Sequence, residues 1–153
     1  MELITSLTNA KVKMALSLQQ KKYRDKYQLF ILEGIRNAEM VIAKNISVQM
    51  CFFTQKAFTN ERGKPILEQL NCPCFEIPEH IYQKISDTQS PQGLMLILPI
   101  QNHNLDDLAT INKSGLYLIL DRLQDPGNIG TIIRTADAMG VKAIICLNGT
   151  ADI

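Results

Sequence analysis

The feature that most constrains the fold is an alternation between runs of β-forming residues and segments with helical spacing. The run QLFILEG at 28–34 stops at a glycine, and IRNAEMVIAKN then carries apolar residues at 35, 38, 41 and 42. The next run, ISVQMCFFT at 46–54, is again rich in β-formers. Apolar side chains spaced three and four apart share one face of a helix. The order strand, helix, strand therefore predicts a layered α/β unit with right-handed crossovers.

The same alternation extends along the chain. A helix is predicted from a cap at Thr8 or Asn9 to about Gln20. Further helices are predicted at 63–70, 79–87 and 128–139, and further strands at 73–78, 93–99, 116–121 and 142–147. We expect a first α/β domain over 1–99, a polar linker over 100–115 and one strand-helix-strand of a second unit over 116–153. The open face of that last piece should make it mobile, dependent on a partner chain or prone to aggregate.

The balance of charge excludes several classes of protein. The chain has 153 residues, of which 46% are hydrophobic and 20% charged, and its formal net charge is +1. These values exclude a disordered chain and a chain-wide polycation for nucleic acid. No apolar run approaches the roughly 20 residues of a membrane span, and the N-terminus lacks the order of a signal peptide. We expect a cytoplasmic protein with no membrane partner.

Cysteine and histidine spacing gives no metal site. The Cys-Pro-Cys at 72–74 is too tight for the paired C-x-x-C of a zinc site, and His80 and His103 lack a second ligand three or four residues away. We expect reduced thiols that pack as small apolar residues at all four cysteines, Cys51, Cys72, Cys74 and Cys146.

A basic stretch lies near the N-terminus. Six of the sixteen basic residues fall between positions 11 and 26, with Asp25 the only acid: Lys11, Lys13, Lys21, Lys22, Arg24 and Lys26. The stretch is either a solvated helix end or a surface that contacts phosphates, since Lys and Arg supply the sequence-independent part of nucleic-acid affinity. Tyr23 and Tyr27 lie among these cations and either stack on unpaired bases or pack on the first domain.

Glu33 ends an apolar strand and is followed by Gly34 and Arg36. It either pairs with Arg36 or Lys22 and fixes the loop, or belongs to the binding surface. On the second interpretation the candidate RNA-binding residues are Lys21, Lys22, Tyr23, Arg24, Glu33 and Arg36.

The most specific motif is DRLQDPGNIGTIIRTADAMG at 121–140. Pro126 and Gly127 break the strand, and Asn128 is predicted to cap the helix that follows. Isoleucines at 129, 132 and 133 share one face with an alanine at 136, which leaves Arg134 on the opposite, polar side. An arginine one to two turns from a helix N-terminus suits a phosphate; the alternative is an exposed pair with Asp125 or Asp137.

Two nucleotide-binding glycine motifs do not fit this segment. The spacing is neither G-x-G-x-x-G nor a Walker loop, because no G-K-[ST] follows. GNIG matches the bare GXXG of an RNA-clamping KH loop, but that loop is expected between helices, whereas this one follows a strand.

The segment LILDRLQDPGNIGTIIRTADAMGVKAIIC resembles the first motif of the SpoU/TrmH-type RNA 2′-O-ribose methyltransferases, in the SPOUT class of knotted enzymes. Upstream, KKYRDKYQLFILEG resembles the start of their substrate-binding domain, and SDTQSPQGLMLIL resembles its last strand. The resemblance spans nearly the whole chain at three places in the correct order.

This resemblance implies a fold and an activity. The first domain would be a ribosomal-protein-like α/β RNA-binding domain. The second would be the first strand-helix-strand of a trefoil-knot methyltransferase domain that binds S-adenosylmethionine and dimerises. The substrate would be a ribose 2′-hydroxyl of rRNA or tRNA, with Asn128 and Arg134 at the family's catalytic positions. The family's knot and cofactor loops follow the strand at 142–147, so the cofactor site is expected after Ile153 and this chain alone is expected not to bind the cofactor.

Two other functions fit the same residues. A non-catalytic RNA-binding module would depend on Lys21, Lys22 and Arg24 but not on Arg134. A small-molecule-binding α/β domain would have no affinity for RNA.

Overall fold

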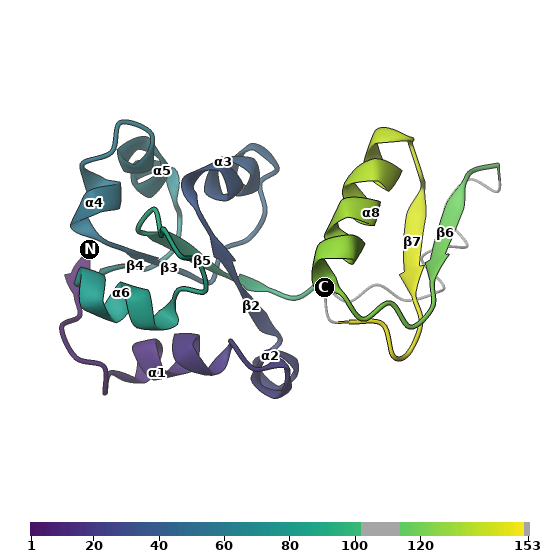
Figure 1. Ribbon diagram of the computed structural model, residues 1–153. Helices are drawn as coiled ribbons and strands as arrows, with labels where there is room; N and C mark the ends of the chain where they lie inside the picture. Colours follow the sequence, from purple (N-terminus) through teal and green to yellow (C-terminus); the bar gives the residue numbers. More distant parts are fainter. Residues whose placement is uncertain (102–113, 152–153) are drawn as a thin grey trace. The chain divides into compact units, whose positions relative to one another are not determined.

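A computed structural model describes residues 1–101 and 114–151 (Figure 1). Contacts between residues divide the chain into two units, Met1–Gln101 and Asn102–Ile153. Most of the segment predicted as a linker, residues 102–113, lies outside the described residues. Each unit is described by itself.

The first unit is built on a five-stranded sheet in the order β1-β4-β3-β5-β2. The strands are β1 (Glu2–Leu3), β2 (Leu29–Glu33), β3 (Met50–Phe53), β4 (Cys74–Glu76) and β5 (Leu94–Pro99). β4 runs parallel to both β1 and β3, whereas β5 runs antiparallel to both β3 and β2. The predicted α/β class is confirmed. The sheet is mixed, because β5 lies between β3 and β2 and runs antiparallel to both. The right-handed crossovers predicted from the sequence connect parallel strands and therefore do not account for β5.

Six helices flank this sheet: α1 (Ala10–Ser17), α2 (Lys21–Tyr27), α3 (Ile35–Ala43), α4 (Gln55–Phe58), α5 (Gly63–Gln69) and α6 (Glu79–Ile85). The predicted cap of α1 is confirmed, since the Asn9 side chain accepts a hydrogen bond from the Lys11 amide at 2.8 Å. The second half of the basic stretch forms a separate helix, α2, where the sequence predicted no element.

Helices cover both faces of the sheet (Figure 1). On one face, α1 and α6 pack over Phe52, Met95 and Ile97. On the other face, α3, α4 and α5 pack over Phe53 and the leucines of β5. β5 is buried along almost its whole length, as a strand covered on both faces must be. Its position as an inner strand makes it the centre of the core.

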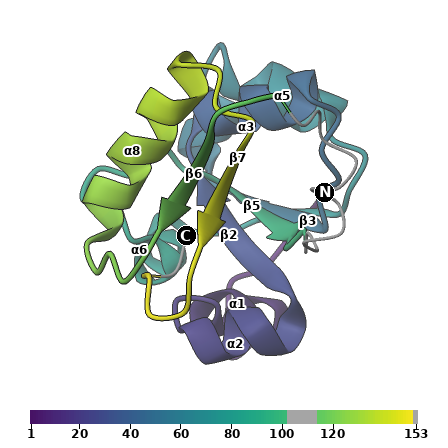
Figure 2. The same cartoon turned by 90° about the vertical axis from the view of Figure 1, so that its right-hand side faces the viewer.

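Over residues 114–151, the second unit is a parallel strand pair with one helix. β6 (Tyr117–Leu120) pairs with β7 (Ala143–Cys146), and α8 (Pro126–Ala138) connects them and lies against one face (Figure 2). All three elements were predicted, and α8 begins two residues earlier than expected. Large apolar side chains remain exposed, with Ile119 at 60% and Met139 at 68%. No helix among residues 1–101 and 114–151 is long and apolar enough to cross a membrane.

Candidate functional site

The N-terminus of α8 is capped by Asp125. The Asp125 carboxylate accepts the Asn128 amide at 2.9 Å, and Pro126 occupies the first helical position, where its missing N–H costs nothing. The prediction that Asn128 is the cap is therefore wrong, because Pro126 starts the helix earlier and moves Asn128 into the first turn. Asn128 is exposed there, so its side chain is available to a ligand.

Arg134 lies on the exposed side of α8, opposite the buried Ile129 and Ala136, as predicted. Its Nη2 donates to Thr131 Oγ1 at 3.1 Å, and that hydroxyl donates to the Gly127 carbonyl at 3.0 Å. A Cβ placed on Gly130 would lie 3.6 Å from the Arg134 Nη1. The guanidinium thus lies back over a glycine toward the helix N-terminus, with Thr131 as its partner in place of Asp125 or Asp137.

The loops that follow β6 and β7 meet at the carboxyl edge of the strand pair. The Ala151 amide donates to the Leu123 carbonyl at 2.7 Å, and Thr150 Oγ1 donates to the Leu120 carbonyl at 3.1 Å. Arg122, in the same loop, has the left-handed φ of 54°, which is uncommon outside glycine. Open α/β sheets bind ligands at this edge. The edge and the first turn of α8 therefore form one candidate site around Asn128 and Arg134.

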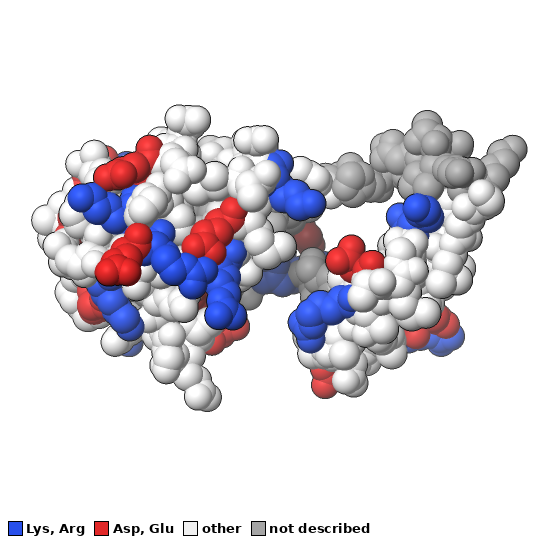
Figure 3. All heavy atoms as spheres, turned by 90° about the horizontal axis from the view of Figure 1, so that it is seen from above, with Lys and Arg blue, Asp and Glu red and all other residues white. Residues whose placement is uncertain are grey.

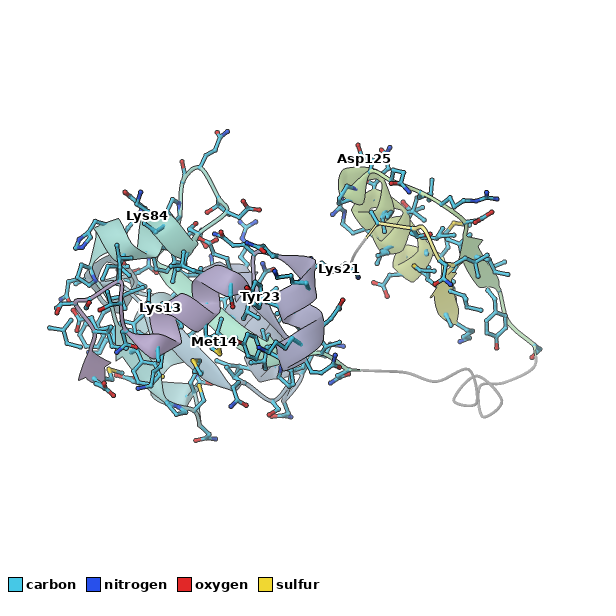
Figure 4. All side chains as sticks on the ribbon, turned by 90° about the horizontal axis from the view of Figure 1, so that it is seen from below. Lys13, Met14, Lys21, Tyr23, Lys84 and Asp125 are labelled. Atoms are coloured by element: carbon cyan, nitrogen blue, oxygen red, sulfur yellow. The ribbon has the colours of Figure 1, made fainter. Side chains whose placement is uncertain are left out.

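The first unit carries basic side chains from three helices on one side. Figure 4 views this side and labels Lys13 on α1, Lys21 and Tyr23 on α2, and Lys84 on α6. We call this surface, together with Lys22 of α2, the basic face. Lys84 was not predicted, since nothing local in the sequence links it to the basic stretch. It is brought there because α6 packs on α1, where Gln19 Nε2 donates to the carbonyls of Lys84 and Ile85, each at 3.3 Å.

The two tyrosines of α2 stack on each other. Their ring centroids are 6.2 Å apart with an interplanar angle of 14°. Lys22 Nζ lies 4.8 Å from the Tyr23 centroid, and Lys26 Nζ lies 5.2 Å from the Tyr27 centroid, both within cation–π range. The Tyr27 side chain is 41% exposed. Tyr27 therefore presents ring surface to solvent beside the Lys26 ammonium, and neither ring belongs to the buried core.

Arg24 has a structural role at the end of α1. Its Nη1 donates to the carbonyls of Leu18 and Gln19, each at 3.0 Å. A cation is favoured at a helix C-terminus, where backbone carbonyls lack partners within the helix. Arg24 therefore joins α1 to α2, and its role as an RNA contact remains a prediction.

The Glu33 carboxylate is held by hydroxyl groups. Its Oε1 accepts hydrogen bonds from Tyr82 Oη at 3.2 Å, Ser86 Oγ at 2.7 Å and Thr88 Oγ1 at 3.0 Å. Burial, and then the nearby Glu33 charge, raise the pKa of Tyr82. Glu33 does fix a loop, but that loop lies between α6 and β5, and the partners are these hydroxyls in place of Arg36 or Lys22.

Arg36 is exposed on α3 among charges of both signs. Arg62 forms a two-pronged ion pair with Glu39, one turn along α3 from Arg36. The hydrogen bond from Arg62, followed by the charges of Arg62 and Arg36, lowers the pKa of Glu39. Acidic and basic side chains alternate on the side that carries α3, α4 and α5 (Figure 3). This side is less suited to a polyanion than the basic face.

Two families of known proteins match the chain in succession. The MRM3-like substrate binding domain matches residues 9–96, and the SpoU rRNA Methylase family matches residues 115–153. The 23S rRNA (guanosine(2553)-2'-O)-methyltransferase RlmP of Bacillus subtilis is 33% identical over 157 residues, covering 99% of this chain and 57% of the relative. The mitochondrial rRNA methyltransferase 3 of Xenopus laevis is 30% identical, covering 88% of this chain and 32% of the relative.

The fold also matches solved structures. The AdoMet-bound rRNA methyltransferase from Sinorhizobium meliloti superposes with a TM-score of 0.83 at 30% identity, covering 99% of this chain and 56% of that one. This chain covers 57% and 51% of the lengths of the first two curated relatives, so it spans about half the length of each.

Proposed function

The chain belongs to the SpoU/TrmH family, and we propose that the protein is an RNA 2′-O-ribose methyltransferase that acts on ribosomal RNA. The observation that carries the proposal is the position of Asn128 and Arg134 on the exposed side of α8, inside the segment that the SpoU family matches. The rRNA methyltransferase names of the relatives support rRNA as the substrate class.

The chemistry asks for a group that stabilises a developing alkoxide. A ribose 2′-hydroxyl is a poor nucleophile while protonated, so the site must orient it and stabilise negative charge in the transition state. An arginine guanidinium is a permanent cation in proteins, so Arg134 acts by electrostatics and by holding the adjoining phosphate, and not as a base. Asp125 accepts the backbone N–H of Asn128, which leaves the side-chain carboxamide of Asn128 without a capping role. This side chain supplies hydrogen bonds to the ribose or phosphate.

S-adenosylmethionine is proposed as the methyl donor, because the Sinorhizobium relative is AdoMet-bound. The donor's carboxylate, ammonium and adenine need polar partners. The described cavity of about 250 Å³ in the second unit is lined mainly by apolar side chains, among them Leu116, Leu118, Ile132 and Met139. Its lining does not fit the donor, and no step of the reaction is assigned to these residues.

We assign RNA binding in the first unit to the basic face. Lysines at 13, 21, 22 and 84 supply positive charge from three helices. The exposed ring of Tyr27 offers a surface on which an unpaired base stacks, a contact worth about 1–3 kcal/mol. The basic face contacts phosphates, and α2 prefers RNA with unpaired bases.

A salt titration of RNA binding tests this assignment. We expect Lys22→Ala to weaken binding to a structured rRNA fragment and to reduce the slope of log K against log salt by about one. Lys64→Ala, on the mixed-charge side, is the matched control and should leave the slope unchanged. Equal effects of the two variants would contradict the assignment.

Two further properties belong to the proposal. A homodimer is supported by the large apolar side chains exposed on the second unit, Leu116, Ile119 and Met139. A cytoplasmic location fits the free cysteines at 51, 72, 74 and 146.

A further inference from the structure

Two thiols face each other across the paired strands β3 and β4. Cys51 and Cys74 are direct register partners, and the Cys51 amide donates to the Pro73 carbonyl at 3.0 Å. Neighbouring strands lie about 4.7–4.9 Å apart. That spacing falls inside the range of Cα separations, about 4.4–6.8 Å, that a disulfide bridges. Both side chains lie on the sheet face that is covered by α3, α4 and α5.

The two thiols differ in access to solvent. Cys51 has an exposed fraction of 0%, whereas Cys74 and its neighbour Cys72 are half-buried. Cys72 lines a cavity of about 280 Å³ between the ends of α3 and α5. A small polar oxidant therefore reaches Cys74 or Cys72 before it reaches Cys51.

The arrangement favours the thiolate of Cys74. Hydrogen bonding from Cys51, and then from Cys72, lowers the pKa of Cys74, although partial burial opposes the shift. The same contacts, together with burial, raise the pKa of Cys51 and Cys72. The thiolate is the nucleophilic form of cysteine. Because Cys74 is also half-buried whereas Cys51 is fully buried, Cys74 is the group of this pair that reacts first.

We propose that Cys74 and Cys51 form an oxidation-sensitive pair that hydrogen peroxide converts into a disulfide between β3 and β4. The Cys74 thiolate attacks one peroxide oxygen, the O–O bond breaks, and hydroxide leaves, which gives a sulfenic acid. The Cys51 thiol then attacks the Cys74 sulfur, and its proton leaves with the sulfenic hydroxyl as water. The two sulfurs lose two electrons and the peroxide gains two. This chemistry is independent of methyl transfer.

Cys51 is the better partner for Cys74 than Cys72. Cys72 and Cys74 are separated by Pro73, and Cys72 lies before β4, so these two thiols do not face each other from paired strands. The Cys74 thiol donates a hydrogen bond to the Cys72 carbonyl at 3.4 Å.

Oxidation of the folded chain with hydrogen peroxide, followed by alkylation and peptide mapping, tests the proposal. We expect a loss of 2 Da, calculated for the departure of two hydrogens, and a peptide that links positions 51 and 74. Cys72→Ser is the matched control and should give the same link, whereas Cys74→Ser should give none. In Cys51→Ala, dimedone should trap a sulfenic acid at Cys74.

The pH dependence gives a second readout. Between pH 7 and pH 5 the rate of oxidation should fall less steeply than that of a thiol with a pKa near 8.5, which would slow about 100-fold. If Cys51→Ala fails to fold, peptide mapping of the oxidised, unsubstituted chain tests the proposal by itself. A 72–74 link, a first modification at Cys72 or Cys146, or four unmodified thiols under peroxide that oxidises free glutathione would overturn it.

Discussion

At the start of α8, two different residues cap the helix and face a ligand, whereas both roles were predicted for Asn128 from the sequence. Asp125 satisfies a backbone amide of the first turn, and the Asn128 side chain is left exposed. A carboxylate at the cap also offsets the positive end of the helix dipole. We therefore expect the proposed anion binding at this site to depend on the Arg134 guanidinium more than on the helix N-terminus.

Replacing the cap tests this division. We expect Asp125→Ala to destabilise α8 by about 1 kcal/mol, because the Asn128 amide loses its acceptor. Asn128→Ala, the matched control in the first turn, should change stability by less than about 0.5 kcal/mol. Hydrogen exchange of the α8 amides measures both. A larger loss of stability in Asn128→Ala than in Asp125→Ala would show that Asn128 is the cap.

The residues that local sequence missed are those whose partners are distant along the chain. Glu33 meets Tyr82, Ser86 and Thr88 only because β2 lies beside β5 and beneath α6. Lys84 joins the basic face for the same kind of reason. By contrast, the exposed position of Arg134 was predictable, since it follows from helical spacing within one segment.

At the level of elements, periodicity predicted most helices and strands but not the direction of β5. A strand that is buried on both faces has no polar alternation, and direction depends on the connection that leads into it. The short helices α2 and α4 were also missed. α2 is a seven-residue helix composed mainly of charged and aromatic residues, with no apolar stripe to mark it.

Gly93, just before β5, shows how closely that connection is packed. Its φ is +78°, and a Cβ there would lie 2.3 Å from Thr54 Oγ1. Thr54 is buried, and its hydroxyl has no hydrogen-bond partner among the described residues. The glycine is therefore required by both backbone conformation and space.

We expect Gly93→Ala to lower the free energy of unfolding by about 2–4 kcal/mol, from left-handed strain and overpacking together. Adding Thr54→Ala removes the crowding atom and should recover the overpacking part, which leaves about 1–2 kcal/mol of backbone strain. Denaturant unfolding of the single and double variants measures the coupling. Strictly additive effects would show that Thr54 is not the obstacle.

At the scale of the whole molecule, the two units differ in how well they bury their apolar surface. The first covers both faces of its sheet, whereas the second leaves Leu116, Ile119 and Met139 exposed around a two-stranded pair. Few buried contacts give low local stability.

Hydrogen exchange should therefore be faster in 117–146 than in 29–98. Protection in the second unit should rise with protein concentration if a second copy covers its apolar side, as the proposed homodimer requires. Equal protection of both units in a dilute, monomeric sample would contradict the expected difference.

Methyl transfer by the natural protein that carries this sequence is the most direct test of the central claim. With labelled S-adenosylmethionine and rRNA, a ribose 2′-O-methyl group leaves an alkali-stable dinucleotide, whereas a base methyl does not. We predict an alkali-stable product whose rate of formation falls about 100-fold or more in Arg134→Ala, because charge stabilisation at the 2′-oxygen is lost. Label on a base, an undiminished rate in Arg134→Ala, or rRNA binding without any transfer would contradict the account, the last outcome favouring a non-catalytic RNA-binding module.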